Sequence, residues 1–305
     1  MAISTVRVQI NGTWTNLTYN SATGAYEATI TAPSATSFNK TGGYYPVTVE
    51  AKNSVGTVTT VNDSTPSLGA SCKLVVKEKT TPVITINSPT SGARVTNSKQ
   101  PVVFTATDES GGSGIKLSTL IVKQDGTVVS SGAITTSAIT NGYTITYTPA
   151  NALADGSHTV TIDVSDNDGN AATQKSTTYI IDTVAPTLNI TSPIEGMATA
   201  STSVVVSGTT NDATSSPVTL TMALDSGTAQ AVTVASNGSF TITFSNLGHG
   251  SHKVVIVAKD AAGKSTTITR NFTVDTSTPV ISKITITPNP ADAGSTMTIS
   301  VVVAG

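Results

Sequence analysis

The sequence predicts an all-β protein, built as tandem two-sheet sandwich modules in an elongated array. Three observations predict this fold class. Thr, Val, Ser and Gly are abundant, whereas charged residues make up only 11% of the chain and aromatic residues only 4%. Short runs of alternating apolar and polar residues recur, with turn residues about every eight to twelve positions. Finally, two longer patterns repeat along the 305 residues.

The first repeated pattern is an alternating segment that ends in Asn/Asp-x-x-Gly. Its three copies span residues 43–56, 156–169 and 250–263. Alternation is typical of a strand with one buried face, and Asn, Asp and Gly are residues that tight turns use. Each copy is therefore predicted to be a strand that enters a hairpin turn.

The second repeated pattern is a proline that follows a threonine-containing linker and precedes another alternating segment. It occurs at Pro82, Pro186 and Pro279. Proline fixes φ and lacks an N–H donor, so it favours the start or the edge of a strand. We place the domain boundaries there. Module one is 1–79, module two is 80–184, module three is 185–277, and the partial module is 278–305.

The two complete modules contain similar sets of predicted strands. In module two these are 83–87, 102–107, 117–123, 143–148, 159–165 and 173–181. In module three they are 187–190, 204–207, 218–224, 240–244, 253–259 and 266–274. About seven short strands with regular turn signals are typical of a two-sheet sandwich.

The two ends of the chain look incomplete in complementary ways. Asn11-Gly12-Thr13 aligns with Asp125-Gly126-Thr127, so module one is predicted to begin at strand C and to lack strands A and B. The segments 281–287 and 296–303 are predicted to be strands A and B of the partial module. One hypothesis is that the tail of one chain completes module one of another by strand addition, giving head-to-tail assembly. The alternatives are a tail that continues, docking of module one on a different protein, or coverage by residues 72–77.

The alternating segment 43–56 of module one resembles a known family of domains. The pattern Tyr-x-Val-x-Val-x-Ala-x-Asn-x-x-Gly resembles strand F of fibronectin type III and bacterial immunoglobulin-like domains. It is formed here by Tyr45, Val47, Val49, Ala51, Asn53 and Gly56. The resemblance implies immunoglobulin/fibronectin III-like sandwiches. His158 and His252 stand where the tyrosine belongs, and a structural corner role is expected for both.

The resemblance also implies a class of function. Tandem modules of this kind occur in phage virions of Gram-positive hosts and in bacterial surface adhesins. Residues 1–7 lack the charged and apolar regions of a secretory signal, which favours the virion. We therefore expect a tail, neck or decoration protein that acts as a spacer or as a weak binder of host-surface carbohydrate. Its partners would be other virion or surface structural proteins, itself, or surface glycans. The alternatives are a stalk fragment of an adhesin on the bacterial cell surface and accessory modules of a polysaccharide-degrading enzyme.

Composition argues against two other classes of partner. The formal net charge is −2 and no Lys/Arg cluster occurs, so no nucleic acid is expected as a partner. No apolar run approaches the roughly 20 residues of a membrane span, so no membrane insertion is expected. Cys72 is the only cysteine, and it is predicted to be a small apolar strand residue beside Leu74 and Val76.

The sequence offers no convincing catalytic set. His158 and His252 belong to different modules and cannot converge, although His249 with His252 could form a weak surface chelate. Asp108 and Glu109 are adjacent on a Gly/Ser loop, without the opposed geometry of glycosidase carboxylates. Ser/His/Asp sets and phosphate-binding glycine loops are not evident. We expect no catalytic residue, no cofactor-binding residue and no enzyme activity.

Two parts of the sequence contain acidic residues that could bind a metal ion. Residues 166–170 resemble a calcium loop, but they lie where a hairpin turn is expected and lack the distal Glu of an EF-hand. Asp182 and Asp275 end two strands beside the linkers. Because no acidic run accompanies them, solvated strand ends are expected. We therefore predict no metal site and no cofactor.

Trp14 is the only tryptophan of the chain. It follows the predicted turn at residues 11–13. Packing in the core or between the sheets is expected for it, and an exposed platform for a ligand is the alternative.

Overall fold

The computed structural model describes residues 2–304, which divide into two compact units. The first unit holds the residues up to Ala93 together with Lys99–Ile180, and the second holds Arg94–Ser98 together with the chain from Ile181 onward. Nearly all regular structure is β, and among the described residues no helix is long and apolar enough to span a membrane.

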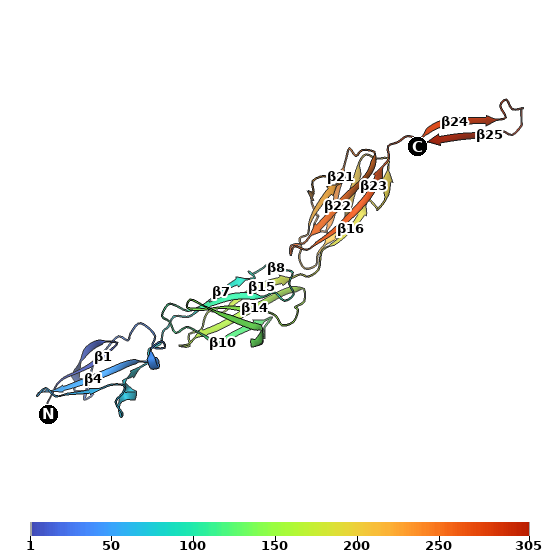
Figure 1. Ribbon diagram of the computed structural model, residues 1–305. Helices are drawn as coiled ribbons and strands as arrows, with labels where there is room; N and C mark the ends of the chain where they lie inside the picture. The colour runs from blue at the N-terminus through green and yellow to red at the C-terminus, as the bar shows by residue number, and fades with distance from the viewer. Residues whose placement is uncertain (1, 305) are drawn as a thin grey trace. The chain divides into compact units, whose positions relative to one another are not determined.

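Module one forms one six-stranded sheet in the order β3-β2-β1-β4-β5, with β6 paired to β4 (Figure 1). Its strands are β1 (Ile3–Ile10), β2 (Thr13–Asn20), β3 (Ala25–Glu27), β4 (Tyr45–Asn53), β5 (Val58–Val61) and β6 (Lys73–Leu74), and its short 3-10 helices are η1 (Thr41–Gly43) and η2 (Gly69–Cys72). The buried apolar residues here are few, namely Val8, Tyr45 and Cys72. This sheet therefore has a smaller core than the sandwiches that follow.

Module two is a sandwich of two sheets. Its elements are β7 (Val83–Ser88), β8 (Arg94–Val95), β9 (Val102–Thr107), β10 (Ile115–Gln124), β11 (Thr127–Val128), η3 (Ser131–Ala133), β12 (Ile134–Ile139), β13 (Gly142–Tyr147), β14 (Gly156–Asp166) and β15 (Lys175–Ile181). One sheet has the order β12-β13-β9-β7, and the other has the order β11-β10-β14-β15 with β8 at its edge. Alternate residues of β9 and β14 face inward, so Phe104 and Ile162 are fully buried.

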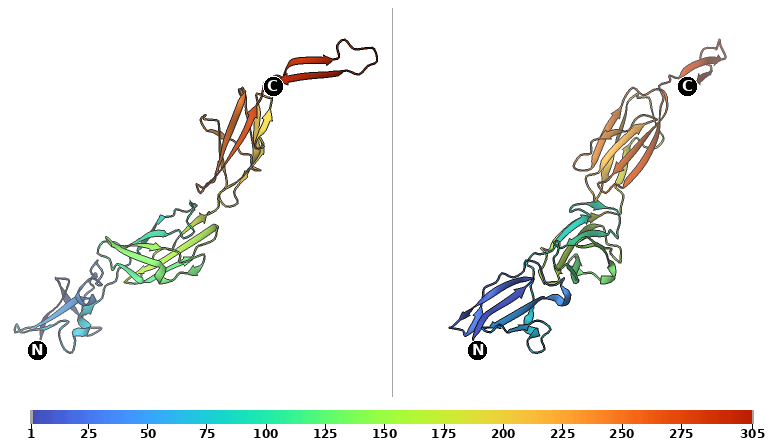
Figure 2. Two further views of the ribbon diagram at one scale, coloured as in Figure 1. Left: turned by 45° about the vertical axis from the view of Figure 1, so that its right-hand side comes forward. Right: turned by 60° about the vertical axis from the view of Figure 1, so that its left-hand side comes forward.

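Module three repeats this plan, and Figure 2 shows its two layers from two sides. Its strands are β16 (Thr187–Ser192), β17 (Met197–Thr199), β18 (Val204–Asn211), β19 (Thr219–Leu224), β20 (Gln230–Val232), β21 (Ser239–Phe244), β22 (Gly250–Lys259) and β23 (Ser265–Val274). The sheet orders are β16-β18-β21 and β17-β23-β22-β19-β20. Val206, Met222 and Ile256 meet in the buried core between these sheets.

The partial module is a hairpin of β24 (Val280–Thr287) and β25 (Thr298–Ala304). Every residue of both strands is exposed, including Ile284 and Val303. An isolated two-stranded hairpin is marginally stable in water, because neither face is covered.

The predicted fold class, tandem β-sandwich modules, is confirmed by these sheets. The sequence did not predict β12, β17 or β20. All three are edge strands. Most residues of β12 and β20 are exposed and β17 has only three residues, so none of them shows the long alternating burial that marks an inner strand.

Candidate functional site

Three buried aspartates meet at one end of the module-three sandwich. Asp182 follows β15, Asp212 follows β18 and Asp260 follows β22. One carboxylate oxygen from each lies within 4.8 Å of the others. Asp182 is 0% exposed, Asp260 is 5% exposed and Asp212 is 8% exposed. All three belong to the second compact unit.

The backbone of the surrounding turns holds each carboxylate by one oxygen. Asp212 Oδ1 accepts hydrogen bonds from the amides of Thr214 and Ser215, at 2.8 and 2.6 Å. Asp260 Oδ1 accepts from the amide of Lys264 at 2.9 Å, and Asp182 Oδ1 accepts from that of Val184 at 3.2 Å. These bonds fix the carboxyl groups without using their second oxygens.

The second oxygens remain without hydrogen-bond partners. Asp182 Oδ2 and Asp260 Oδ2 are buried and accept no hydrogen bond, and the hydroxyl of Ser215 beside them is also buried without a partner. No ion pair of the described residues involves any of the three aspartates. Arg94 reaches the same loop, but its guanidinium donates to the carbonyl of Ser216. A buried carboxylate without a partner is costly, so this cluster of oxygens requires a compensating charge or proton.

A related cluster occurs in the first compact unit. It consists of Glu78, Asp108 and Glu109, with carboxylate oxygens again within 4.8 Å. Each of these residues also has one buried oxygen without a hydrogen-bond partner. Burial, followed by a hydrogen bond that the protonated Glu78 carboxyl group donates to Glu109, raises the pKa of Glu78. Glu78 lies 104 residues before Asp182, and Asp108 lies 104 residues before Asp212. Two of the three positions in the two clusters are therefore equivalent.

These clusters correct two sequence-based predictions. Asp182 was expected to be a solvated strand end without acidic neighbours, but it is fully buried beside Asp212 and Asp260. Asp108 and Glu109 were expected on an open Gly/Ser loop, but Asp108 is buried and its Oδ2 accepts from the amide of Gly114 at 2.6 Å. The expectation for Asp275 holds, because its side chain is 56% exposed.

Two histidines form equivalent corners in modules two and three. His158 Nδ1 lies 2.7 Å from Asp125 Oδ2, and its Nε2 lies 2.8 Å from the carbonyl oxygen of Ala154. His252 makes the same two contacts, with Asp225 Oδ2 and the carbonyl oxygen of Gly248, both at 2.9 Å. The predicted corner role is confirmed. Because both nitrogens of His252 are engaged, it is not part of a chelate with His249.

The corners change the protonation of the histidines. Burial acts to lower the pKa of His158, but the hydrogen bonds to Asp125 and Ala154 outweigh it, so that the pKa is raised. The hydrogen bonds to Gly248 and Asp225 raise the pKa of His252. A carboxylate and a carbonyl are both acceptors, so only the doubly protonated imidazolium satisfies both contacts.

Module one has the tyrosine version of the same corner. The hydroxyl group of Tyr45 donates to the carbonyl of Ala35 at 3.1 Å, and Tyr45 is only 3% exposed. The side chain at the start of this strand therefore ties the strand to the preceding loop in all three modules. In modules two and three the imidazole performs this task and also reaches an aspartate.

The calcium-like segment 166–170 is a hairpin turn, as expected. Asp166 Oδ1 accepts from the amides of Gly169 and Asn170, at 2.6 and 2.8 Å, and its Oδ2 accepts from Asn170 Nδ2 at 2.7 Å. Both oxygens of this carboxylate are therefore occupied by the turn itself. This distinguishes Asp166 from its equivalent Asp260, whose Oδ2 has no partner.

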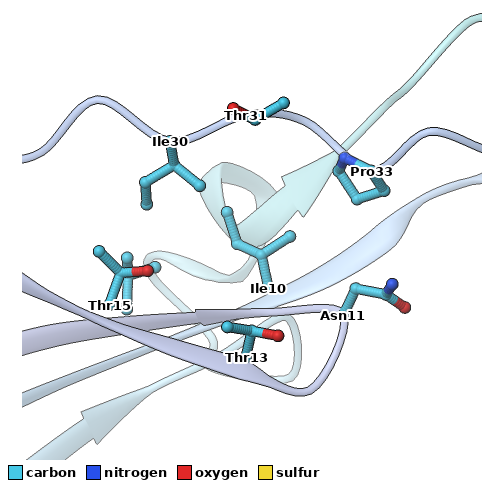
Figure 3. Close-up of a pocket in the computed structure, with 8 residues that line it drawn as sticks. Ile10, Asn11, Thr13, Thr15, Ile30, Thr31 and Pro33 are labelled. Atoms are coloured by element: carbon cyan, nitrogen blue, oxygen red, sulfur yellow. The ribbon is translucent and has the colours of Figure 1, made fainter.

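A shallow hollow of about 190 Å³ lies on the sheet of module one. Figure 3 shows Ile10, Thr13 and Thr15 on one side of it, with Ile30 and Pro33 in the segment that passes opposite. No charged side chain lines this hollow. It can hold a small apolar or hydroxyl-bearing group, because aliphatic side chains, threonine hydroxyl groups and one asparagine line it.

Comparisons with known proteins agree with this architecture. Residues 80–183 match the family described as bacterial Ig-like domain, and residues 186–276 match the family described as glucodextranase, domain B. These modules are immunoglobulin-like β-sandwiches. A search of curated proteins finds no match.

Several solved structures are similar to this immunoglobulin-like chain. The fibronectin(III)-like modules of Clostridium thermocellum CbhA are 19% identical, with a TM-score of 0.38, over 63% of this chain and 94% of that one. Drosophila N-cadherin EC1-3 is 13% identical, with a TM-score of 0.29, over 89% of each chain. Bacteroides ovatus SGBP-B, solved with a mixed-linkage heptasaccharide, is 16% identical, with a TM-score of 0.23, over 95% of this chain and 65% of that one. Likenesses at this level carry no argument about ligands.

Two predictions for module one need correction. Trp14 is half-buried on β2 and lies outside the core, with the guanidinium carbon of Arg7 4.2 Å from its ring centroid. Cys72 is buried as predicted, but it ends the 3-10 helix η2 and precedes strand β6. In both cases the sequence pattern indicated an alternating strand, and it did not reveal that this module has a small core.

Proposed function

We propose that this chain is a non-enzymatic structural protein whose immunoglobulin-like modules act as spacers, with a phage virion as their setting. The observation that carries the proposal is the recurrence of the histidine–aspartate corner. A His–Asp pair is the arrangement in this chain that most resembles catalytic machinery. Here both nitrogens of His158 and of His252 contact backbone carbonyls and turn aspartates. Neither imidazole is available as a general base.

The arrangement of the modules supports a spacer role. Modules two and three each have a two-sheet core of their own. Such modules can be added in series without disturbing each other's cores. The virion setting, as a tail, neck or decoration component, is supported by the resemblance of the whole arrangement to immunoglobulin-like repeat proteins of phage particles, since the modules are in tandem, rich in Thr and Ser, and without cysteine pairs. Weak binding of a surface glycan is compatible with the uncharged hollow of module one.

A location experiment tests this proposal. Antibodies raised against the purified chain would be used on three fractions of the producing culture: particles banded by density, washed cell envelopes, and secreted protein. We expect the particle band to carry the antigen, and electron microscopy with gold-labelled antibody should place it at one structure of the particle. Antigen confined to the envelope of unlysed cells would contradict the virion setting and favour an adhesin stalk.

A second function is favoured by one observation. Residues 186–276 match a domain of a glucodextranase, so the chain could belong to the accessory part of a polysaccharide-degrading enzyme. This function predicts that the purified chain is retarded in a native gel that contains dextran, and that the antigen copurifies with a hydrolase from the secreted fraction. Unchanged migration in dextran, together with antigen in the particle band, would exclude it.

A further inference from the structure

We propose that Asp182, Asp212 and Asp260 form a binding site for one Ca²⁺ ion. This inference does not depend on the proposed function. Its starting point is the electrostatics of the cluster. Three carboxylates converge within 4.8 Å, and all three are more than nine-tenths buried. No Lys, Arg or His side chain of the described residues pairs with them.

The decisive observation is that two of the three clustered carboxyl groups each have a buried oxygen without a partner. Asp182 Oδ2 and Asp260 Oδ2 accept no hydrogen bond, whereas the Oδ1 atoms of the same residues are held by backbone amides. The turns thus hold Asp182 and Asp260 by one oxygen and leave the other, buried oxygen free to bind an ion. Leaving such oxygens unsatisfied costs free energy, and a bound cation removes that cost.

The spacing of the oxygens suits calcium. Ca²⁺ binds oxygen ligands at about 2.3–2.6 Å, so two oxygens on the same ion lie at most about 5 Å apart. The three carboxylate oxygens meet this limit at 4.8 Å. The buried Ser215 hydroxyl, next to Asp212, offers a further oxygen. Water and backbone carbonyls can complete the six to eight ligands that Ca²⁺ takes.

The chemistry of the ligands excludes other common metals as the preferred ion. The cluster contains oxygen donors and neither histidine nor cysteine, which zinc and copper sites favour. Mg²⁺ requires near-ideal octahedral geometry at shorter distances and retains most of its water. Three fixed carboxylates on separate turns match the larger and more adaptable coordination sphere of Ca²⁺.

The loops that carry the ligands are joined to each other. The amide of Ala261, next to Asp260, donates to the carbonyl of Ser215 at 3.0 Å. The hydroxyl of Ser216 donates to the carbonyl of Asp212 at 2.6 Å. These hydrogen bonds fix the loop after β18 against the turn after β22. The site is therefore largely formed before the ion arrives.

The cluster of Glu78, Asp108 and Glu109 supports this reading, because the same kind of arrangement recurs at equivalent positions. In this cluster each of the three residues has one buried oxygen without a partner, whereas in the first cluster Asp182 and Asp260 do. The two clusters differ in one ligand. Asp166 stands at the position of Asp260, but the carboxylate of Asp166 is bonded within its own turn, and Glu109 provides the third carboxyl group instead. We assign the cluster that contains Glu109 as a second Ca²⁺ site of the same class.

The experiment uses the full chain, stripped of metal with a chelator and dialysed. Equilibrium dialysis against CaCl₂ gives the number of ions bound, and calorimetric unfolding gives the transition temperatures. We expect saturable binding, and a rise of about 10 °C in the transition of module three when Ca²⁺ exceeds its dissociation constant a hundredfold. The same concentration of MgCl₂ should produce less than half of this rise.

Variants locate the site. Asp260→Asn keeps the oxygen that accepts from Lys264 and removes the charge, so the number of bound ions should fall by one. Asp108→Asn should remove the other ion. The matched control is Asp275→Asn, because Asp275 occupies the position equivalent to Asp182 but is exposed and outside any cluster. It should bind as many ions as the unchanged chain.

The metal-free state shows whether a variant has merely failed to fold. Without Ca²⁺, Asp260→Asn should unfold at the same temperature as the unchanged chain or higher, because it relieves repulsion among the carboxylates. The proposal is overturned if the chain binds no Ca²⁺ at millimolar concentration, or if Asp260→Asn binds as many ions as the unchanged chain. An equal response to Mg²⁺ would overturn the assignment of the metal.

Discussion

His252 and Asp225 join the start of β22 to the turn that follows β19, with Nδ1 2.9 Å from Oδ2. The same carboxylate accepts from the amide of Lys253 through its other oxygen, at 2.9 Å. Asp125 repeats this with His158 and the amide of Thr159. One aspartate thus holds both the side chain and the backbone of the strand opposite.

This relationship predicts how stability depends on pH. The pKa values of His158 and His252 are raised in the folded state, so the protonated rings stabilise the fold. This stabilisation is complete below the ordinary histidine pKa of about 6.5, and it is lost as the pH rises through the raised values. Calorimetry of the Ca²⁺-loaded chain between pH 5 and 9 should show the module-two and module-three transitions falling across that window. In the double variant His158→Gln, His252→Gln the fall should disappear, and a persistent fall would contradict this assignment.

The tyrosine corner predicts a local stability effect in module one. Tyr45→Phe removes the hydrogen bond that the buried Tyr45 donates to the carbonyl of Ala35. The free energy of unfolding of this module should decrease by about 1 kcal/mol. Tyr19→Phe is the control, because Tyr19 is 56% exposed. Urea denaturation, followed by the fluorescence of Trp14 in the same sheet, measures the free energy of unfolding of both variants. Equal losses in Tyr45→Phe and Tyr19→Phe would argue against the corner.

A close backbone approach in module three predicts a strong effect of one methyl group. A Cβ atom at Gly208 would lie 2.1 Å from the carbonyl oxygen of Asn189 and 2.8 Å from the ring of Phe240. Gly208→Ala should therefore separate β18 from its neighbours and destabilise the module by about 1–3 kcal/mol. Gly248→Ala is the matched control, because no atom lies within 4 Å of that Cβ position. Thermal unfolding should distinguish the two variants clearly.

The exposed hairpin β24–β25 gives a test of head-to-tail assembly, which stays a prediction. If the apolar strands of one chain complete the sheet of module one in another, removing residues 279–305 should abolish oligomers. Analytical ultracentrifugation of both forms over a hundredfold range of concentration measures this. A full-length chain that stays monomeric at every concentration would contradict self-assembly. Hydrogen exchange should then find the amides of Ile284 and Val301 poorly protected, since the hairpin is exposed on both sides.

Much of the fold was predictable because it rests on local alternation. The predicted strand at residues 102–107 is β9 with the same bounds, and its burial alternates at every residue. The bounds of β14 and β22 were predicted too short at their starts, because Gly156 and Gly250 belong to the strands. Glycine usually marks a turn, and sequence alone does not show that Gly250 pairs with Val274 or that Gly156 begins a strand.

The acidic clusters were not predicted, because their members are far apart in the sequence. Asp212 and Asp260 lie 30 and 78 residues after Asp182. Each follows the end of a different strand, and the sandwich brings these strand ends together. A usable signal did exist, since Asp108 and Asp212 occupy the same place after equivalent strands. Comparing the modules at their strand ends, where ligands from different strands converge, would have revealed it.

The position of Asp182 has a practical consequence for cutting the gene into fragments. The segment that matches a known family begins at residue 186, four residues after this aspartate. A fragment trimmed to that match would keep Asp212 and Asp260 but lose Asp182. Its sandwich would be intact, but its ion site would lack one of three carboxylates. A fragment that starts at Ile181 would keep all three. A module defined by sequence similarity therefore begins a few residues later than a module defined by its complete set of acidic ligands.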